Sequence, residues 1–118
     1  LVGSSMGGAT VATAAVTHSD DIRGIVLQYP AINLNPDAMV SGAPLDVNGY
    51  TGPVLILQGT KDVIVPMEMS KNLAAHYNTL RDDHAELIIY EGQPHVFTGK
   101  YKVLAAKEIY RFLEEAAS

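Results

Sequence analysis

Three side chains of this sequence, Ser5, Asp62 and His95, are of the types that together support nucleophilic catalysis. A serine hydroxyl is a weak nucleophile until an adjacent base takes its proton. An imidazole can be that base, and a carboxylate can hold the imidazole in the tautomer that accepts the proton. The residues around each side chain decide whether the three can meet in space.

Ser5 lies in Gly3-Ser4-Ser5-Met6-Gly7, which matches the pattern G-x-S-x-G of a sharp turn from a strand into a helix. We expect Ser5 to have a strained backbone and to project its hydroxyl above a sheet, at the positive end of the following helix. The glycines two positions to either side would let strand and helix pass without Cβ clashes. The backbone N–H of Met6 would then point at an oxyanion developing on a substrate.

Alternating apolar runs and helical patterns predict the elements that position these residues. We expect strands at 1–2, 22–29, 53–57 and 86–90 and helices at 9–18, 66–80 and 101–116. On the helix at 66–80 one face carries Met69, Leu73, Tyr77 and Leu80, and on the last helix the apolar stripe includes Leu104, Phe112 and Leu113.

Strands that alternate with helices predict right-handed crossovers and a mostly parallel sheet. The expected fold class is therefore α/β, with three α/β/α layers. Ser5, Asp62 and His95 each follow the carboxyl end of a predicted strand, where parallel sheets bind ligands. Residues 31–52 are rich in Asn, Pro and Gly, which predicts an irregular connection with a short helical turn near 36–40.

Composition excludes several classes of partner. The 118 residues have a net charge of −5 and no basic cluster, which argues against nucleic acid or an anionic membrane surface. There is no cysteine, so disulfides and thiolate metal sites are excluded. No apolar run approaches the roughly 20 residues that span a bilayer. The default compartment is cytoplasmic, and the absence of an initial Met predicts that the N-terminus is truncated.

Other candidate residues have simpler interpretations. The runs His18-Ser19-Asp20-Asp21 and Asp82-Asp83-His84 mix histidine with carboxylates, but short runs at element boundaries favour solvated turns over a metal site. His84 is accordingly expected on the surface. Asp46 is an alternative to Asp62 as the acid, although it follows no predicted strand. Met67 and Met69 are interpreted as packing residues. We expect no metal and no cofactor.

Three motifs carry a resemblance to a known superfamily. They are GSSMGG around Ser5, PVLILQGTKDVIVP around Asp62 and LIIYEGQPHVF around His95. Together, in the order Ser, Asp, His, they resemble the second half of the α/β-hydrolase catalytic domain over essentially the whole chain. The resemblance implies Ser5 as nucleophile, Asp62 as acid, His95 as general base and the Met6 N–H as an oxyanion donor.

Within the superfamily the sequence looks most like small feruloyl or cinnamoyl esterases and dienelactone hydrolases, and prolyl-oligopeptidase-type peptidases share similar motifs. Gln58 stands where the family more commonly has His, which we do not expect to alter the chemistry. The family's sheet has about eight strands, so we expect a partial fold without the N-terminal strands. The loop that supplies the second oxyanion donor would be missing with them. Residues 1–118 are thus the expected C-terminal portion of a catalytic domain, with 31–52 in place of a lid.

Three hypotheses for function follow. The first is a serine hydrolase that cleaves a small-molecule carboxylic ester through an acyl-enzyme, with a pocket made by Tyr29, Pro30, Val63 and Ile64. The stretch 63–65 could equally pack in the core. The second is a serine peptidase of the prolyl-oligopeptidase type. The third is a non-catalytic fragment that self-associates through an exposed sheet edge or face, which would carry Ile25, Leu27, Leu55 and Leu57.

Overall fold

The computed structural model describes residues 1–34, 43–44 and 47–117. Its elements follow the chain in the order β1 (Val2–Ser4), α1 (Met6–Thr17), β2 (Ile25–Gln28), β3 (Ile32–Asn33), β4 (Ala43–Pro44), β5 (Val54–Gly59), α2 (Met67–Leu80), β6 (Ala85–Tyr90) and α3 (Lys100–Ala117). Four strands form a parallel sheet in the order β1-β2-β5-β6. All the strands and helices that the sequence predicts within the described residues are present.

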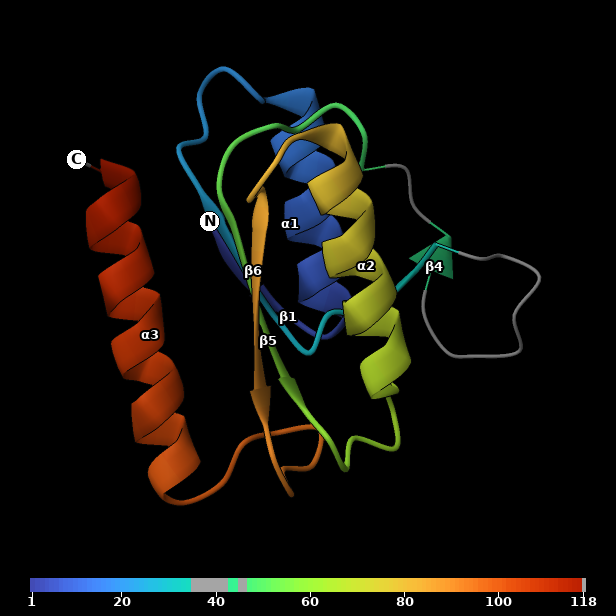
Figure 1. Cartoon of the computed structure of the whole chain (residues 1–118), viewed down its shortest axis with the longest axis vertical. Coiled ribbons are helices and arrows are strands. Elements are labelled where there is room, and N and C mark those ends of the chain that lie inside the picture. The colour runs from blue at the N-terminus through green and yellow to red at the C-terminus, as the bar shows by residue number, and fades with distance from the viewer. Residues whose placement is uncertain (35–42, 45–46, 118) are drawn as a thin grey trace.

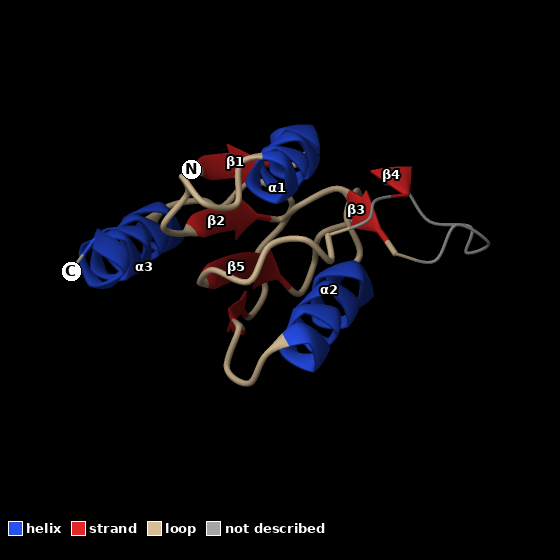
Figure 2. Ribbon diagram, turned by 90° about the horizontal axis from the view of Figure 1, so that it is seen from above, coloured by secondary structure: helices blue, strands red, loops and turns tan. Residues whose placement is uncertain are grey.

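Helices cover both faces of this sheet, as Figures 1 and 2 show. On one face α1 and α2 pack on the sheet through a cluster that includes Ala12, Leu27 and Leu73. On the other face α3 packs through a second cluster that includes Leu55 and Phe112. The predicted α/β class with three layers and a parallel sheet is therefore confirmed. The four strands of the main sheet are about half of the eight expected for the whole superfamily fold.

Small side chains bring α1 close to the sheet. Ala12 and Ala15 are fully buried and Ala9 nearly so. Helix α1 begins at Met6, immediately after Ser5, so the prediction that this helix starts at residue 9 was wrong. The first turn of α1 is helical despite its two glycines, which have a low helix propensity, because tertiary contacts favour the helix there.

The central strands are continuous apolar runs, as expected of parallel strands with helices on both sides. All six residues of β5 are buried, including Gln58 and Gly59. The strand thus extends two residues beyond the predicted range, because the pairing with β6 continues to Gly59 and Tyr90. Strand β2 is shorter than predicted.

Helix α2 presents its predicted face to the core. Met69, Leu73 and Tyr77 are buried, and Leu80 packs against the same cluster. The expectation that His84 lies on the surface was wrong. Its side chain is only 1% exposed, and Nδ1 lies 2.9 Å from the carbonyl oxygen of Tyr77. Burial lowers the pKa of His84 below its ordinary value of 6.5, and the bond to Tyr77 partly opposes this shift.

Helix α3 joins the sheet through fewer apolar contacts than its stripe predicts. Ala105 and Phe112 are buried, whereas Leu104 and Leu113 are 41% and 37% exposed. Arg111 supplements these contacts by forming ion pairs with carboxylates of β6 and of α3 itself. Its partners are Glu86, Glu108 and Glu115. Hydrogen bonds that Arg111 donates to Glu108 and Glu86 raise the pKa of its guanidinium above the usual range.

The four side chains expected on an unpaired apolar face are covered. Ile25, Leu27, Leu55 and Leu57 are all fully buried, because helices cover both faces of the sheet. Self-association through a free strand edge stays a prediction, with Val2 of β1 46% exposed.

The connection after β2 contains a two-residue parallel pair, β3 with β4, which the sequence did not predict. The expected helical turn near 36–40 and Asp46 lie outside the described residues. Among the residues that are described, no helix combines the length and apolar character of a membrane span.

Candidate active site

Ser5 occupies the turn between β1 and α1 with φ +52° and ψ −122°. A positive φ is strained for a residue with a side chain, as the G-x-S-x-G pattern predicts. Backbone hydrogen bonds fix this conformation from both sides. The Ser5 N–H donates to Gln28 (3.0 Å), and the Ser5 carbonyl accepts from Gly8 (3.0 Å) and Ala31 (2.9 Å). The end of β2 therefore supports the strained serine.

Two glycines allow the close packing around this turn. A Cβ at Gly3 would overlap the carbonyl oxygen of Gly7 and lie 2.6 Å from Cγ2 of Val11. A Cβ at Gly8 would lie 2.8 Å from Cβ of Pro30. At Gly7 a Cβ would meet nothing within 4 Å, so the prediction of a Cβ clash at this position was wrong. Gly3 and Gly8 are the glycines required by space.

The carboxylate of Asp62 is held in the loop between β5 and α2, with its side chain fully buried. Oδ1 accepts the backbone N–H groups of Ile64 (2.9 Å) and Val65 (2.7 Å). A carboxylate commonly caps the backbone two or three residues on in this way. Oδ2 remains directed at His95.

His95 lies in the turn between β6 and α3, and Gly59 lets this turn approach β5. A Cβ at Gly59 would overlap the carbonyl oxygen of Gln93 and lie 2.9 Å from its Cβ. The same carbonyl accepts the N–H of Lys61 at 3.0 Å. The Gln93 side chain accepts hydrogen bonds from the backbone and hydroxyl of Thr98. The loop after β5 that carries Asp62 and the turn after β6 that carries His95 are thus joined directly.

The three predicted side chains meet in one line. Nδ1 of His95 lies 2.8 Å from Oδ2 of Asp62, and Nε2 lies 3.0 Å from Oγ of Ser5. Because an ionised carboxylate can only accept, Nδ1 carries the proton and Nε2 is free to accept one from the serine. The His95 side chain is 15% exposed. Residues 90 positions apart in the sequence therefore form a continuous hydrogen-bonded chain.

Tyr29 holds the imidazole from the side. It follows β2 with φ +36°, and its N–H donates to Leu57 at 2.7 Å. Its ring centroid lies 4.8 Å from that of His95 and 5.1 Å from that of Phe97. Burial raises the pKa of the Tyr29 phenol, and the negative charge of Asp62 raises it further.

Met6 is the first residue of α1. Its backbone N–H is among those that have no partner within the helix and lie at the positive end of the helix dipole. This is the position expected of an oxyanion donor, and that role stays a prediction. The side chain of Met6 is 62% exposed.

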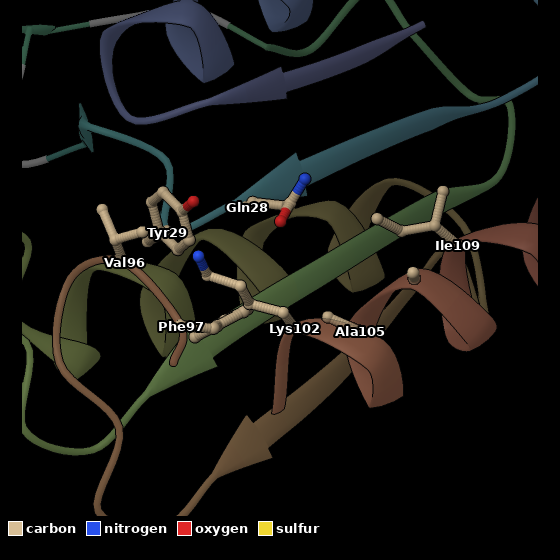
Figure 3. Close-up of a pocket in the computed structure, with 8 residues that line it drawn as sticks. Gln28, Tyr29, Val96, Phe97, Lys102, Ala105 and Ile109 are labelled. Carbon is tan, nitrogen blue, oxygen red and sulfur yellow. The ribbon is translucent and has the colours of Figure 1, made fainter. Parts of the chain in front are cut away.

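The predicted pocket residues separate into three groups. Tyr29 lines a cavity of about 320 Å³ between the end of β2, residues 96–97 and α3, with Lys102 and Ile109 on its α3 side (Figure 3). Pro30 is buried against the start of α1. Val63 and Ile64 are exposed and do not line this cavity, whereas Val65 is buried in a small cluster. Of the stretch 63–65, only Val65 therefore packs in the core.

Gln58 is the site residue whose contacts the sequence analysis missed. Its side chain is fully buried and lies 3.4 Å from Oδ2 of Asp62. The signal was a polar side chain near the end of an otherwise apolar, buried strand. Elsewhere among the described residues, no three metal-ligating side chains converge, and the expectation that no cofactor is needed stays a prediction.

Comparison with solved structures shows the fold of the chain. Est1E from Butyrivibrio proteoclasticus, also solved with ferulic acid bound, aligns with a TM-score of 0.76 and 22% identity over 99% of this chain and 61% of Est1E. A Klebsiella pneumoniae protein assigned as a dienelactone hydrolase gives a TM-score of 0.72, 22% identity and coverages of 99% and 50%. A Bacteroides ovatus protein assigned as a dipeptidyl aminopeptidase IV gives a TM-score of 0.79 and 17% identity, over 97% of this chain and 18% of that protein.

These alignments and the strand order define the α/β-hydrolase fold, and the suspected resemblance is confirmed. The chain spans about three fifths of the length of Est1E. A family model described as the prolyl oligopeptidase family matches residues 37–118, which is more than half of the chain and includes Asp62 and His95. The chain belongs to the prolyl oligopeptidase family. A search of curated proteins found no match.

Proposed function

We propose that this chain carries the catalytic centre of a serine hydrolase that cleaves carboxylic esters through an acyl-enzyme. One observation carries the proposal: the imidazole of His95 bridges the hydroxyl of Ser5 at 3.0 Å and the carboxylate of Asp62 at 2.8 Å. Both distances lie within the range of a hydrogen bond, and the one between Ser5 and His95 allows proton transfer from the hydroxyl to the imidazole.

The proposed mechanism follows from this geometry. Ser5 Oγ attacks the ester carbonyl while its proton passes to Nε2 of His95. The Met6 N–H stabilises the oxyanion, and His95 then delivers the proton to the leaving alcohol oxygen as the ester C–O bond breaks. Water, deprotonated by His95, hydrolyses the acyl-serine and restores the hydroxyl. Asp62 stabilises the imidazolium at each stage without taking its proton.

Exposed apolar side chains beside the catalytic residues favour an apolar substrate. Met6 follows Ser5, Val63 and Ile64 follow Asp62, and Val96 follows His95. These four are 62%, 91%, 53% and 55% exposed. Contact with the apolar part of an ester would remove this surface from water, which contributes about 25 cal/mol per Å². The substrate class supported best is therefore an ester with an apolar acyl or alcohol group.

Cleavage of peptide bonds is a second candidate because the chain belongs to the prolyl oligopeptidase family. The same chain of hydrogen bonds would serve either reaction, and they differ in the leaving group that His95 must protonate. Matched ester and anilide substrates with one acyl group separate the two. If the ester and the anilide differ in kcat/KM about as much as their uncatalysed hydrolysis rates differ, an esterase is favoured. Efficient cleavage of an anilide after proline favours the peptidase.

A fluorophosphonate probe tests the catalytic proposal. The probe should label wild-type protein covalently, and Ser5→Ala and His95→Ala should abolish labelling. Ser4→Ala is the matched control because this neighbouring hydroxyl pairs with the phenol of Tyr29 rather than with His95. Unchanged labelling of Ser5→Ala would rule Ser5 out as the nucleophile.

Failure of wild-type protein to react with either the probe or an ester would favour the third hypothesis, an interaction module. Size-exclusion chromatography supplies the independent measurement, since a self-associating module would elute at a concentration-dependent volume. A monomer that turns over esters contradicts that hypothesis.

A further inference from the structure

The side-chain amide of Gln58 is buried next to Asp62, the proposed acid. Gln58 is the fifth of the six residues of β5, and its side chain is completely removed from water. Burying an amide costs free energy unless its polar atoms find hydrogen-bond partners. The partners of Gln58 therefore indicate what the residue does at this position.

Three acceptor atoms surround the amide nitrogen of Gln58. Nε2 lies 3.0 Å from the carbonyl oxygen of Val65, 3.1 Å from that of Gly59 and 3.4 Å from Oδ2 of Asp62. None of these atoms can donate a hydrogen bond, so the orientation of the amide is determined. The two carbonyl bonds are the shorter ones, and the carboxylate receives the longer third contact.

These contacts connect the two ends of the acid loop, residues 59–65. By binding Gly59 and Val65 together, Gln58 fixes the curvature of the backbone between them. That curvature directs the N–H groups of Ile64 and Val65 at Oδ1 of Asp62. With Oδ1 held by the loop, Oδ2 is left facing His95.

Helix α2 fixes the other end of the amide. The hydroxyl of Ser70 donates to Oε1 of Gln58 at 2.6 Å, and both side chains are fully buried. The hydrogen-bonded chain from Ser5 through His95 and Asp62 thus continues through Gln58 to Ser70.

We propose that Gln58, anchored by Ser70, is a positioning residue that sets the orientation of the Asp62 carboxylate and, through it, of His95. This inference rests on the proposed serine-hydrolase function. Gln58 touches no substrate and transfers no proton. Because its amide does not titrate, it holds the loop in the same way at every working pH.

Gln58→Met tests the proposal, because methionine has a similar shape and no hydrogen-bond donor. A carboxylate displaced by about 1 Å can cost about 10²-fold in rate. We therefore expect kcat to fall about 10–100-fold while KM changes less than about twofold. The downfield proton resonance of the Nδ1–H shared by His95 and Asp62 should weaken or shift. Gln58→His, which keeps a ring N–H, should recover part of the lost kcat.

Leu73→Ala is the control for stability, because it shortens a buried α2 side chain that packs in the apolar core and forms no hydrogen bond. It should lower the unfolding midpoint while kcat at a temperature where the protein is folded stays near wild type. An equal loss of kcat in Leu73→Ala would overturn the proposal, since the effect of Gln58→Met would then be one of stability. If Gln58→Met does not fold, Ser70→Ala replaces it, with an expected fall in kcat of about 3–10-fold.

Ser5→Ala separates the failure of this proposal from that of the proposed function. Turnover and labelling of Ser5→Ala at the wild-type level mean that the hydrolase proposal itself is wrong. The positioning role alone is overturned if Ser5→Ala is inactive while Gln58→Met keeps wild-type kcat and an unchanged Nδ1–H resonance. Where Ser70→Ala replaces Gln58→Met, wild-type kcat in Ser70→Ala has the same meaning.

Discussion

Gly59→Ala should separate the turn that carries His95 from strand β5. The added Cβ would overlap the carbonyl oxygen of Gln93 and lie 2.9 Å from its Cβ. Carbon atoms in contact prefer about 3.5–4.0 Å, so the turn must move by about 1 Å. A main-chain carbonyl held by the N–H of Lys61 cannot rotate away as a side chain can.

The displacement reaches His95, which is two residues beyond Gln93. Misplacing a catalytic group by about 1 Å costs about 10²-fold, or roughly 2.7 kcal/mol of transition-state stabilisation. The forced packing should also lower the free energy of unfolding by about 1–3 kcal/mol. We therefore expect kcat/KM to fall about 10²-fold in a variant that still folds.

Ester turnover and urea unfolding, measured on the same preparations, check this prediction. The matched control is Gly7→Ala, because a Cβ at Gly7 meets nothing within 4 Å. A folded Gly59→Ala protein with wild-type kcat/KM would refute the reasoning, since the close approach of β5 and the turn would then not determine the position of His95.

Three further predictions follow from other contacts. Gly7→Ala should raise the free energy of unfolding by about 0.8 kcal/mol, as alanine does inside helices, and keep kcat within about twofold; a loss of stability in urea unfolding would contradict the assignment of open space. Asp62→Asn should lower kcat about 10⁴-fold, because the amide can favour the wrong tautomer of His95; stopped-flow acylation kinetics would measure this, and a loss below tenfold would argue against the role of Asp62. Because burial lowers the pKa of His84 in the folded chain, the unfolded chain takes up a proton first as the pH falls through 6.5. The free energy of unfolding of the wild-type protein should therefore decline relative to that of His84→Gln, by at most about 1.4 kcal/mol per pH unit. Urea midpoints of the two proteins that fall in parallel between pH 7.5 and 5.5 would refute this prediction.

The positions of Ser5, Asp62 and His95 could be predicted because each follows the carboxyl end of a strand. Strand order and the crossover rule then bring such residues to one edge of the sheet. Their meeting needs no information beyond the local motifs and the topology. The catalytic roles themselves are a separate question that the experiments above address.

Features that depend on tertiary neighbours could not be predicted. Gly7 was expected to lack room for a Cβ and Gly8 was not singled out, because only the position of Pro30 shows that the restricted glycine is Gly8. His84 was expected in water because its neighbours Asp82 and Asp83 are polar, whereas the carbonyl of Tyr77 provides a partner for a buried imidazole. The bonds of Gln58 likewise join residues from β5, the acid loop and α2.

The backbone bonds of Ser5 determine which member of the chain can adjust during a reaction. Its N–H and its carbonyl are both occupied by neighbouring backbone, so the main chain of the proposed nucleophile is fixed. A reaction in which one base serves first the attacking oxygen and then the departing one needs a small change of aim. With the main chain of Ser5 anchored, in the proposed reaction that reorientation falls to the imidazole of His95, which packs beside Tyr29.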